Sequence, residues 1–379
     1  MSRWSEQLRS QMPVTRKWAY FDHAAVAPLS LPGQTALQEW AADVAENGDA
    51  NWGAWRKEVE RVRRSAAKLL NAKQAEIALI HNTTEGVNIV AEGFPWRAGD
   101  NVVLPAGEFP TNLYPWLNLV DRGVEVRQVA TESERLDPAA VATACDERTR
   151  IVAVSWVGYA TGWRNDLDAL VELAHGQGAL LFVDAIQALG VQPIDVAQTP
   201  IDFLAADGHK WLLGPEGAGV FYMRREHLER LRPLGVGWNS VKQAGEFSDS
   251  RFDLRESAGR YEGGSYNMPG IAALGASLAL LSEYGAQAIA ERIDDVGNQL
   301  CDALTSCGAT IVSCREPHRR SGIVAFDWPT TEPPAEIQRR CRAQGVILNT
   351  RGGHLRVSPH AYTNADDISR LCAALAATS

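Results

Sequence analysis

The sequence has no apolar run long enough to cross a membrane: nowhere in its 379 residues do 18 uncharged apolar residues follow one another. Its first ten residues contain Arg3, Glu6 and Arg9 where a secretory signal would have an apolar core. We therefore expect a cytoplasmic protein that has no membrane partner.

The chain also has no excess of basic charge, because 37 Lys and Arg stand against 46 Asp and Glu and leave a formal net charge of −9. A protein that binds the phosphate backbone of DNA or RNA usually carries a clustered basic face. The composition therefore argues against nucleic acid as a partner. Its 45% of hydrophobic residues describe a globular chain that buries a large core.

Several motifs of other protein classes are missing. The six cysteines form no Cys-x-x-Cys pair, so we expect neither a metal site nor a disulfide framework. Gly-x-Ser-x-Gly and His-Glu-x-x-His are absent, which argues against hydrolases. The run from Gly214 to Gly219 has the wrong glycine order for a dinucleotide-binding turn and precedes a predicted strand, which argues against a nicotinamide dehydrogenase.

What the sequence does contain is a regular alternation of short β-rich runs with helical patterns between residues 77 and 223. This order is typical of a mostly parallel sheet covered by helices, in the α/β class. Seven strands are predicted: Ile77–Ile80, Asn101–Leu104, Val124–Val129, Ile151–Ser155, Leu180–Val183, Phe203–Ala205 and Gly219–Met223. A helix is predicted over Asp166–His175, with Asn165 as its N-cap.

After about residue 286 the alternation loosens, and two helical stretches with short strands between them fit a smaller α+β domain. We therefore expect a large domain over residues 19–285 and a small domain formed by residues 1–18 and 286–379. No flexible linker or repeat separates them, so the two should be packed together.

Two segments carry most of the chemical information. An apolar run ends in Asp184, which predicts a buried strand that delivers a carboxylate to the edge of the sheet where open α/β folds bind ligands. Lys210 follows the next strand, within Gly208-His-Lys, and can reach the same edge. A lysine paired with an acid is what pyridoxal phosphate (PLP) needs, because the amine forms a Schiff base and the acid keeps the pyridine nitrogen protonated.

A third segment, His81-Asn-Thr-Thr-Glu85, leaves a predicted strand and enters a helix. The free amides of a helix start, together with the hydroxyls of Thr83 and Thr84, form a cradle that suits a phosphate, although a simple N-cap would leave the same pattern.

The order of these elements, Thr-Thr-Glu-Gly, then Asp184-x-x-Gln187, then His209-Lys210, resembles the class V aminotransferase family of fold type I PLP enzymes. That group includes cysteine desulfurases, selenocysteine lyases and isopenicillin N epimerase-like proteins. The similarity runs from Tyr20 to Arg356, and it implies the PLP-dependent transferase fold type I.

The resemblance implies roles for individual residues around PLP. Lys210 would form the Schiff base, Asp184 would pair with the pyridinium nitrogen, and Gln187 would hydrogen-bond the phenolic oxygen of the cofactor. Thr84 and the amides around Thr83 and Glu85 would hold the phosphate, helped by His209. Phe109 would stack on the cofactor where many relatives have histidine.

Three further residues are implied at the rim of the site. Arg356 matches the arginine that binds the substrate α-carboxylate, for which a planar guanidinium is suited. Ser265 would reach the phosphate of the neighbouring subunit, which implies a homodimer. Asn112 is predicted to line the substrate pocket because it follows Phe109 closely in the sequence.

Two departures from the family pattern bear on the reaction. Asp207 stands where many relatives carry a phosphate-binding serine, and its charge would repel a phosphate unless it points away. Desulfurases also need a loop cysteine that accepts sulfur as a persulfide, and the stretch from Asn349 to Arg356 has none. Cys341 lies too early in the sequence to replace it.

We therefore predict a PLP-dependent enzyme that acts at the α-carbon of a small amino acid by aminotransfer or β-lyase (C–S lyase-like) chemistry. Epimerisation is the alternative, and the missing cysteine disfavours persulfide-forming desulfuration. A non-catalytic relative would be expected to have lost Lys210, Asp184 or Arg356, and all three are present.

Overall fold

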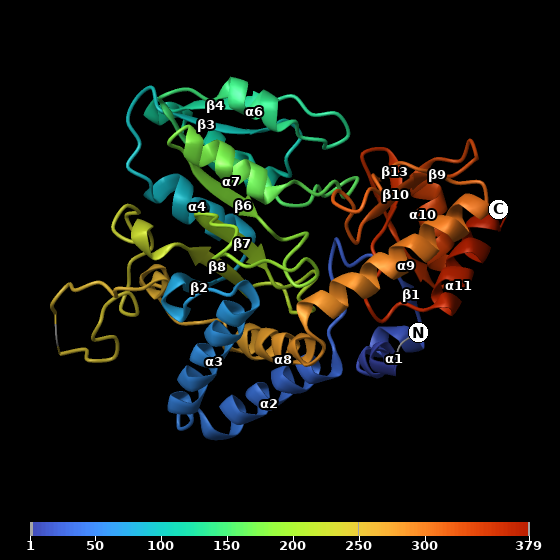
Figure 1. The fold of residues 1–379 in the computed structure, drawn as a ribbon. Helices are drawn as coiled ribbons and strands as arrows, with labels where there is room; N and C mark the ends of the chain where they lie inside the picture. Colours follow the sequence, from blue (N-terminus) through green and yellow to red (C-terminus); the bar gives the residue numbers. More distant parts are fainter. Residues whose placement is uncertain (1–2, 249, 378–379) are drawn as a thin grey trace.

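The computed structural model describes residues 3–248 and 250–377, which form a large α/β unit and a smaller C-terminal unit (Figure 1). The strands of the large unit are β2 (Ile77–Ile80), β3 (Asn101–Pro105), β4 (Glu125–Val129), β5 (Thr149–Ser155), β6 (Leu180–Asp184), β7 (Phe203–Asp207) and β8 (Gly219–Met223). Its helices are α2 (Leu31–Asn47), α3 (Trp52–Leu70), α4 (Thr83–Gly93), α5 (Tyr114–Leu117), α6 (Pro138–Ala144), α7 (Leu167–Gly176) and α8 (Met268–Tyr284).

The seven strands form one sheet in the order β2-β8-β7-β6-β5-β3-β4. All neighbours are parallel except at β8, which runs antiparallel to both β2 and β7. The predicted α/β class and the mostly parallel seven-stranded sheet are therefore confirmed. Each predicted strand lies within two residues of its observed bounds.

Residues of one strand alternate between two hydrophobic cores, one on each face of the sheet. In β6, Leu181 and Val183 join the core that includes α3, α7 and α8, while Phe182 joins the core that includes α4. Because both faces are covered by helices, the strands read as continuous apolar runs, as parallel strands do.

The helix that follows β2 packs unusually close to the sheet. A Cβ on Gly86 of α4 would lie 2.5 Å from the Cβ of Ala205 in β7, so only glycine allows this approach. Elsewhere the observed caps refine the predictions: α7 is capped by Asp166, whose side chain accepts from the Ala169 amide, and not by Asn165. The side chain of Asn165 instead donates to the Ser155 carbonyl.

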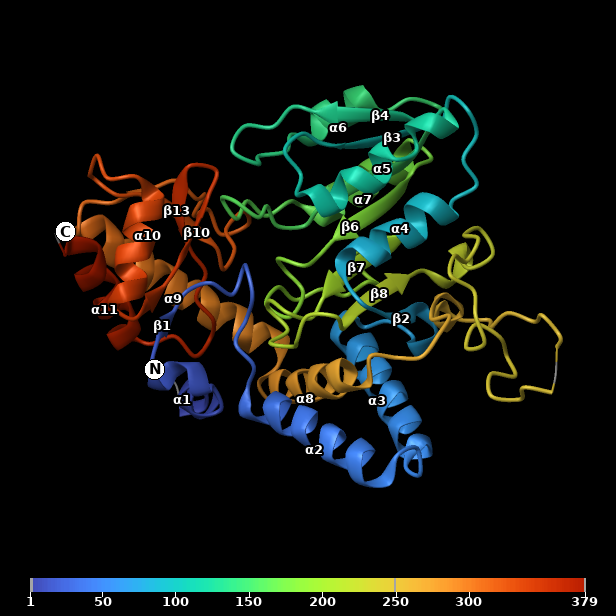
Figure 2. The same cartoon turned by 180° about the vertical axis from the view of Figure 1, so that it is seen from behind.

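The C-terminal unit contains an antiparallel sheet in the order β12-β13-β10-β9 and a separate core of its own. Its helix α9 runs towards it from the large unit (Figure 2). Its elements are α9 (Ala286–Ser306), β9 (Thr310–Ile311), β10 (Val324–Asp327), α10 (Pro334–Ala343), β11 (Val346–Ile347), β12 (Asn349–Arg351), β13 (His354–Val357) and α11 (Ala365–Ala376).

The N-terminal segment belongs spatially to this second unit. After α1 (Arg3–Ser10), the short strand β1 (Ala19–Tyr20) pairs in parallel with β11, and Asp22 forms a bridge with Ser358. The expected division began the large domain at residue 19, and these pairings tie residues 19–22 to the C-terminal unit. Within the described residues, no helix is long and apolar enough to cross a membrane.

Candidate functional site

The carboxyl ends of three neighbouring strands bring the predicted site residues to one edge of the sheet. Ser155 at the end of β5 is in register with Asp184 at the end of β6, and Asp184 is in turn in register with Ala205 of β7. β7 ends at Asp207, and Lys210 follows three residues later. The predicted placement of both residues at this edge is thus seen in the structure.

Asp184 and Lys210 influence one another through their charges. Asp184 is only 3% exposed, and burial raises its pKa to about 6, although the amide of Ile186 (3.0 Å) and the charge of Lys210 oppose this shift. Burial lowers the pKa of Lys210 to about 8, against the opposing effect of Asp184. The lysine therefore has a neutral fraction near physiological pH, which a nucleophilic amine requires.

Phe109 stands beside this lysine. Its ring centroid lies 5.8 Å from the Nζ atom of Lys210, and its ring meets that of Tyr159 edge to face at 5.3 Å. The side chain is 42% exposed, which for a large apolar ring leaves a face open to a ligand. Its predicted role as a stacking residue stays a prediction with this geometry in its favour.

Glu108, directly before Phe109, was not predicted as a functional residue. Its carboxylate accepts hydrogen bonds from the amide of Ser155 (2.7 Å) and from the Ser155 hydroxyl. Burial and the nearby charge of Asp184 raise its pKa to about 7. Two neighbouring carboxyl groups at one strand edge therefore disfavour ionisation of both at once, a feature common at functional sites.

Gln187 is buried and already makes two side-chain hydrogen bonds. Its Nε2 donates to the Ala24 carbonyl at 3.0 Å, and its Oε1 accepts from Nε1 of Trp211 at 3.0 Å. These bonds fix the amide next to Lys210, and the second hydrogen of Nε2 stays available for the predicted contact with a phenolic oxygen.

The start of α4 carries the predicted phosphate cradle. The Thr83 hydroxyl accepts from the amide of Asp207 at 3.0 Å, and the Glu85 amide donates to the N-cap Asn82 at 2.9 Å. The amides of Thr83 and Thr84 have no intrahelical acceptor, because they lie in the first turn. The exposed Thr84 hydroxyl pairs only with that of Thr111, at 3.0 Å.

The carboxylate of Asp207 is directed into its own loop. One carboxylate oxygen accepts from the Gly208 amide at 2.7 Å, and the other lies 2.9 Å from Nδ1 of His209. This imidazole nitrogen is buried, and the angle at which it faces Asp207 is unsuitable for a hydrogen bond. At the position where many relatives have a phosphate-binding serine, Asp207 therefore interacts with its own loop.

Arg356 lies on β13 and is 1% exposed. Its Nη2 lies 3.2 Å from Oδ1 of Asp22, and its Nη1 donates to the Tyr159 carbonyl at 2.5 Å. Its Nε atom is buried without a hydrogen-bond partner in the described chain. Asp22, far away in the sequence, was not predicted; only its place within the segment that resembles the family pointed to it.

The two remaining predicted residues, Asn112 and Ser265, contact other parts of the chain. Asn112 is fully buried, and its Oδ1 accepts from Nε1 of Trp116 at 3.1 Å, so its side chain supports the packing of α5. Ser265 is exposed and borders a small hollow together with His81 and Glu85. Their substrate and phosphate roles stay predictions.

β12 and β13 form a tight hairpin at the position where desulfurases need a cysteine-bearing loop. The turn consists of Gly352 and Gly353 alone, with φ of 58° and 86°, a backbone that favours glycine at both positions. None of the six cysteines lies on this hairpin. The stretch without a cysteine is thus a two-residue turn and not a longer loop.

These residues fit PLP. A buried carboxylate and a lysine of lowered pKa meet at one edge, an aromatic ring stands beside the lysine, and helix-start amides with the exposed hydroxyl of Thr84 are available for a phosphate.

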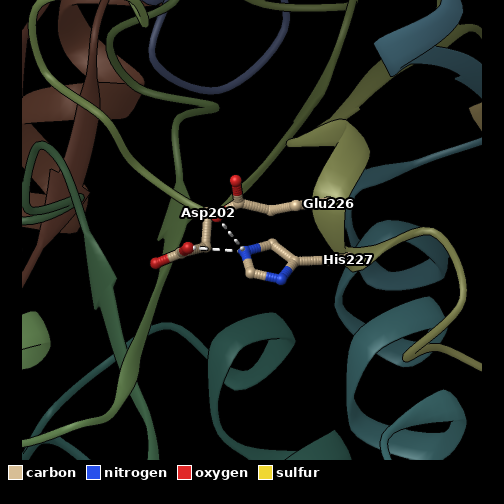
Figure 3. Close-up of side chains that lie close together, drawn as sticks. All are labelled: Asp202, Glu226 and His227. Atoms are coloured by element: carbon tan, nitrogen blue, oxygen red, sulfur yellow. Dashed lines mark hydrogen bonds and ion pairs between the residues drawn. The ribbon is translucent and has the colours of Figure 1, made fainter.

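A different cluster lies at the opposite edge of the sheet, just before β7. Nε2 of His227 lies 2.6 Å from Oδ1 of Asp202 and 3.9 Å from Glu226 (Figure 3). The other oxygen of Asp202 lies 2.8 Å from Nε2 of His175 and accepts from the Leu181 amide. Because its hydrogen bonds are already made, this carboxylate serves to join β6, β7 and α7.

Comparison with known proteins agrees with this geometry. The profile of the family described as Aminotransferase class-V matches residues 19–378. A probable cysteine desulfurase of Methanothermobacter thermautotrophicus is 32% identical over 97% of this chain and 96% of its own length. A cysteine desulfurase of Klebsiella pneumoniae is 34% identical over 85% of this chain and 82% of its own.

Solved structures are similar over almost the whole chain. The Escherichia coli cysteine desulfurase CsdA superposes with a TM-score of 0.86 at 27% identity, covering 98% of this chain and 97% of that one. The cystine C–S lyase C-DES, in complex with its product cysteine persulfide, gives a TM-score of 0.91 at 24% identity and covers 96% and 99%. The chain belongs to the class V aminotransferase family of PLP-dependent enzymes.

Proposed function

We propose that this protein is a C–S lyase: a PLP-dependent enzyme that cleaves the Cβ–S bond of a cysteine-derived amino acid by β-elimination, without a protein persulfide. The observation that carries the proposal is the β12–β13 hairpin, which has no cysteine and turns on two glycines, while Lys210, Asp184 and Arg356 are all retained. Relatives named for cysteine desulfuration, and a neighbour named for cystine C–S cleavage, support sulfur chemistry.

Each residue has a defined task in this proposal. Arg356 binds the substrate α-carboxylate with its guanidinium, which Asp22 and the Tyr159 carbonyl hold in place. Lys210, neutral above a pKa of about 8, takes the proton from the α-carbon. Asp184, as an anion, keeps the ring nitrogen of the cofactor protonated.

When bound, PLP supplies an electron-accepting ring that takes up the negative charge left at the α-carbon. Phe109 can pack against a ligand but has no exchangeable proton, so acid–base work falls to Lys210. The thiol then leaves from the β-carbon with a proton, and hydrolysis of the remaining enamine gives pyruvate and ammonium.

The test is to purify the protein with PLP, confirm its near-visible absorption band, and measure the products formed from cysteine and cystine. We expect equal amounts of pyruvate and ammonium, and loss of both the band and the products in Lys210→Ala. Alanine with a persulfide on the protein would instead identify a desulfurase, a 2-oxo acid without ammonium an aminotransferase, and a D-amino acid an epimerase.

We also propose a homodimer in which Ser265 reaches the phosphate site of the neighbouring subunit. Ser265 is exposed, and the segment before it, residues 233–248 and 250–256, extends away from the body of the large unit (Figure 1). That segment exposes large apolar side chains, with Phe247 81% and Phe252 71% accessible. A second copy would cover them.

A further inference from the structure

Arg351 is a cation for which the described part of the chain supplies no acid. It ends β12, directly before the Gly352–Gly353 turn. Its Nη1 donates to Oδ1 of Asn349 (3.0 Å) and to the Thr350 carbonyl (2.8 Å), both neutral acceptors. Among the described residues, no carboxylate lies within ion-pair distance of its guanidinium, and its Nε and Nη2 make no hydrogen bond.

Arg351 lies on the same strand face as Asn349, two residues before it on β12, and Asn349 is in register with Arg356 on β13. Burial lowers the pKa of Lys210 and raises the pKa of Asp22; the charge of Arg351 adds to the first shift and opposes the second, so the guanidinium lies within electrostatic reach of both. Asn349 links it to the same network, since Nδ2 of Asn349 donates to Oδ2 of Asp22 at 2.7 Å and Asp22 holds Arg356. Three cationic side chains therefore surround the place where a substrate binds.

One guanidinium at this end of the site has acid partners and the other has none. Asp22 forms an ion pair with Arg356, and the charge of Glu134 also acts on Arg356, whereas no carboxylate among the described residues pairs with Arg351, so its positive charge stays uncompensated. The zwitterion of a simple amino acid brings no net charge to compensate it. An amino acid with an additional carboxylate brings one negative charge, and a guanidinium with two free N–H directions is suited to bind it bidentately.

We propose that Arg351 is a specificity-determining residue that binds an anionic group at the far end of the substrate side chain. Resting on the proposed function, this assigns the substrate class as a sulfur amino acid whose sulfur substituent ends in a carboxylate. Two sources share this chemistry: S-carboxyalkyl cysteines, and disulfide amino acids such as cystine, whose second half carries a carboxylate.

The decisive comparison uses two isosteric substrates, S-carboxymethylcysteine and S-carbamoylmethylcysteine, which differ only by a carboxylate and an amide. β-Elimination of either breaks the Cα–H and Cβ–S bonds and gives pyruvate, ammonium and the corresponding thiol. We expect the PLP-loaded enzyme to prefer the carboxylate by about 10- to 100-fold in kcat/KM, as charge-assisted hydrogen bonds allow. Arg351→Gln should abolish the preference, and Arg351→Lys should keep part of it.

Arg135→Gln is the matched control, because it removes the same charge from an exposed arginine that stacks on Trp163 with its Cζ atom 5.6 Å from the ring centroid. We expect this variant to keep the wild-type preference. A wild-type enzyme that uses both substrates equally, or an Arg351→Gln variant that keeps the preference, would overturn the proposal. Cystine is assayed in parallel to decide between the two sources. If Arg351→Gln loses activity with only one of cystine and S-carboxymethylcysteine, the substrate class is the one to which that compound belongs.

A binding measurement separates this proposal from the proposed function. Succinate carries two carboxylates but no amino group, so it cannot react, and its affinity for the PLP-loaded protein can be measured by calorimetry. We expect about 10- to 100-fold weaker binding in Arg351→Gln. Binding that depends on Arg351 in a protein that forms no pyruvate would refute the lyase but keep the anion site. Pyruvate formation together with succinate binding that does not depend on Arg351 would support the lyase and refute the anion site.

Discussion

The protonation of the site is set by burial of single side chains at one strand edge. Removing a carboxylate from water raises its pKa, and removing an amine from water lowers it, so Asp184 and Lys210 move towards each other on the pH scale. Above a pH of about 6 Asp184 is an anion, and its charge holds the pKa of Lys210 higher than burial alone would.

This gives a prediction for the protein without cofactor. The rate at which added PLP attaches to Lys210 should rise with pH to a midpoint near 8, because only the neutral amine reacts. In Asp184→Asn the midpoint should move to lower pH, since the charge that favoured the ammonium form is gone. The rate of appearance of the near-visible band between pH 7 and 10 measures both, and a wild-type midpoint near 10 would contradict the prediction.

A loop that includes Tyr159 holds Arg356, and Glu134 holds this loop in turn. Glu134 accepts hydrogen bonds from the amides of Ala160 (2.8 Å) and Thr161 (2.6 Å) and from the Thr161 hydroxyl. Ser133 and Glu134 both have positive φ, 51° and 66°, which costs energy in residues other than glycine. The strained turn thereby fixes the loop whose Tyr159 carbonyl accepts from Arg356.

We therefore expect Glu134→Ala to act on substrate binding more than on turnover. Leaving two amides without an acceptor should release the loop and misplace Arg356, raising KM about 5- to 100-fold, while kcat changes less. Glu132→Ala, an exposed neighbour, is the control and should leave both constants unchanged. Steady-state kinetics with the best amino-acid substrate decides; an equal fall in kcat would point to a different role.

At the scale of the whole molecule, the exposed aromatic side chains in the segment before Ser265 indicate a surface that another molecule covers. Trp238 and Phe247 meet edge to face with ring centroids 6.1 Å apart, and Phe252 is 71% exposed nearby in the sequence. Apolar rings that remain this accessible usually mark an association surface.

If a second copy covers this segment, Phe247→Ser together with Phe252→Ser should convert a dimer into a monomer. Burial of an aromatic side chain stabilises by about 1.5–3 kcal/mol, so losing two on each subunit weakens association strongly. Light scattering coupled to size-exclusion chromatography gives the mass directly. Val120→Ser, which also removes an exposed apolar side chain, serves as the control. A monomeric wild-type protein would refute the homodimer.

The sequence alone determined the sheet, because continuous apolar runs without polar alternation, bounded by turn residues, are the local signature of buried parallel strands. It also placed Asp184 and Lys210 at one edge, since the ends of adjacent parallel strands meet there. The helix cap at Asp166 was missed by one residue, because Asn165 and Asp166 are both good caps and only the packing of Asn165 against Ser155 decides between them.

Only the tertiary structure decided which distant residues complete the site. Asp22 meets Arg356 and Asn349, and Glu108 meets Ser155, through contacts between segments that no sequence period connects. The same holds for charge: the sequence names the ionisable groups, but burial and neighbours set their pKa values, and those depend on the folded arrangement. The local pattern thus specified the scaffold and its lysine, and the fold specified the electrostatics around them.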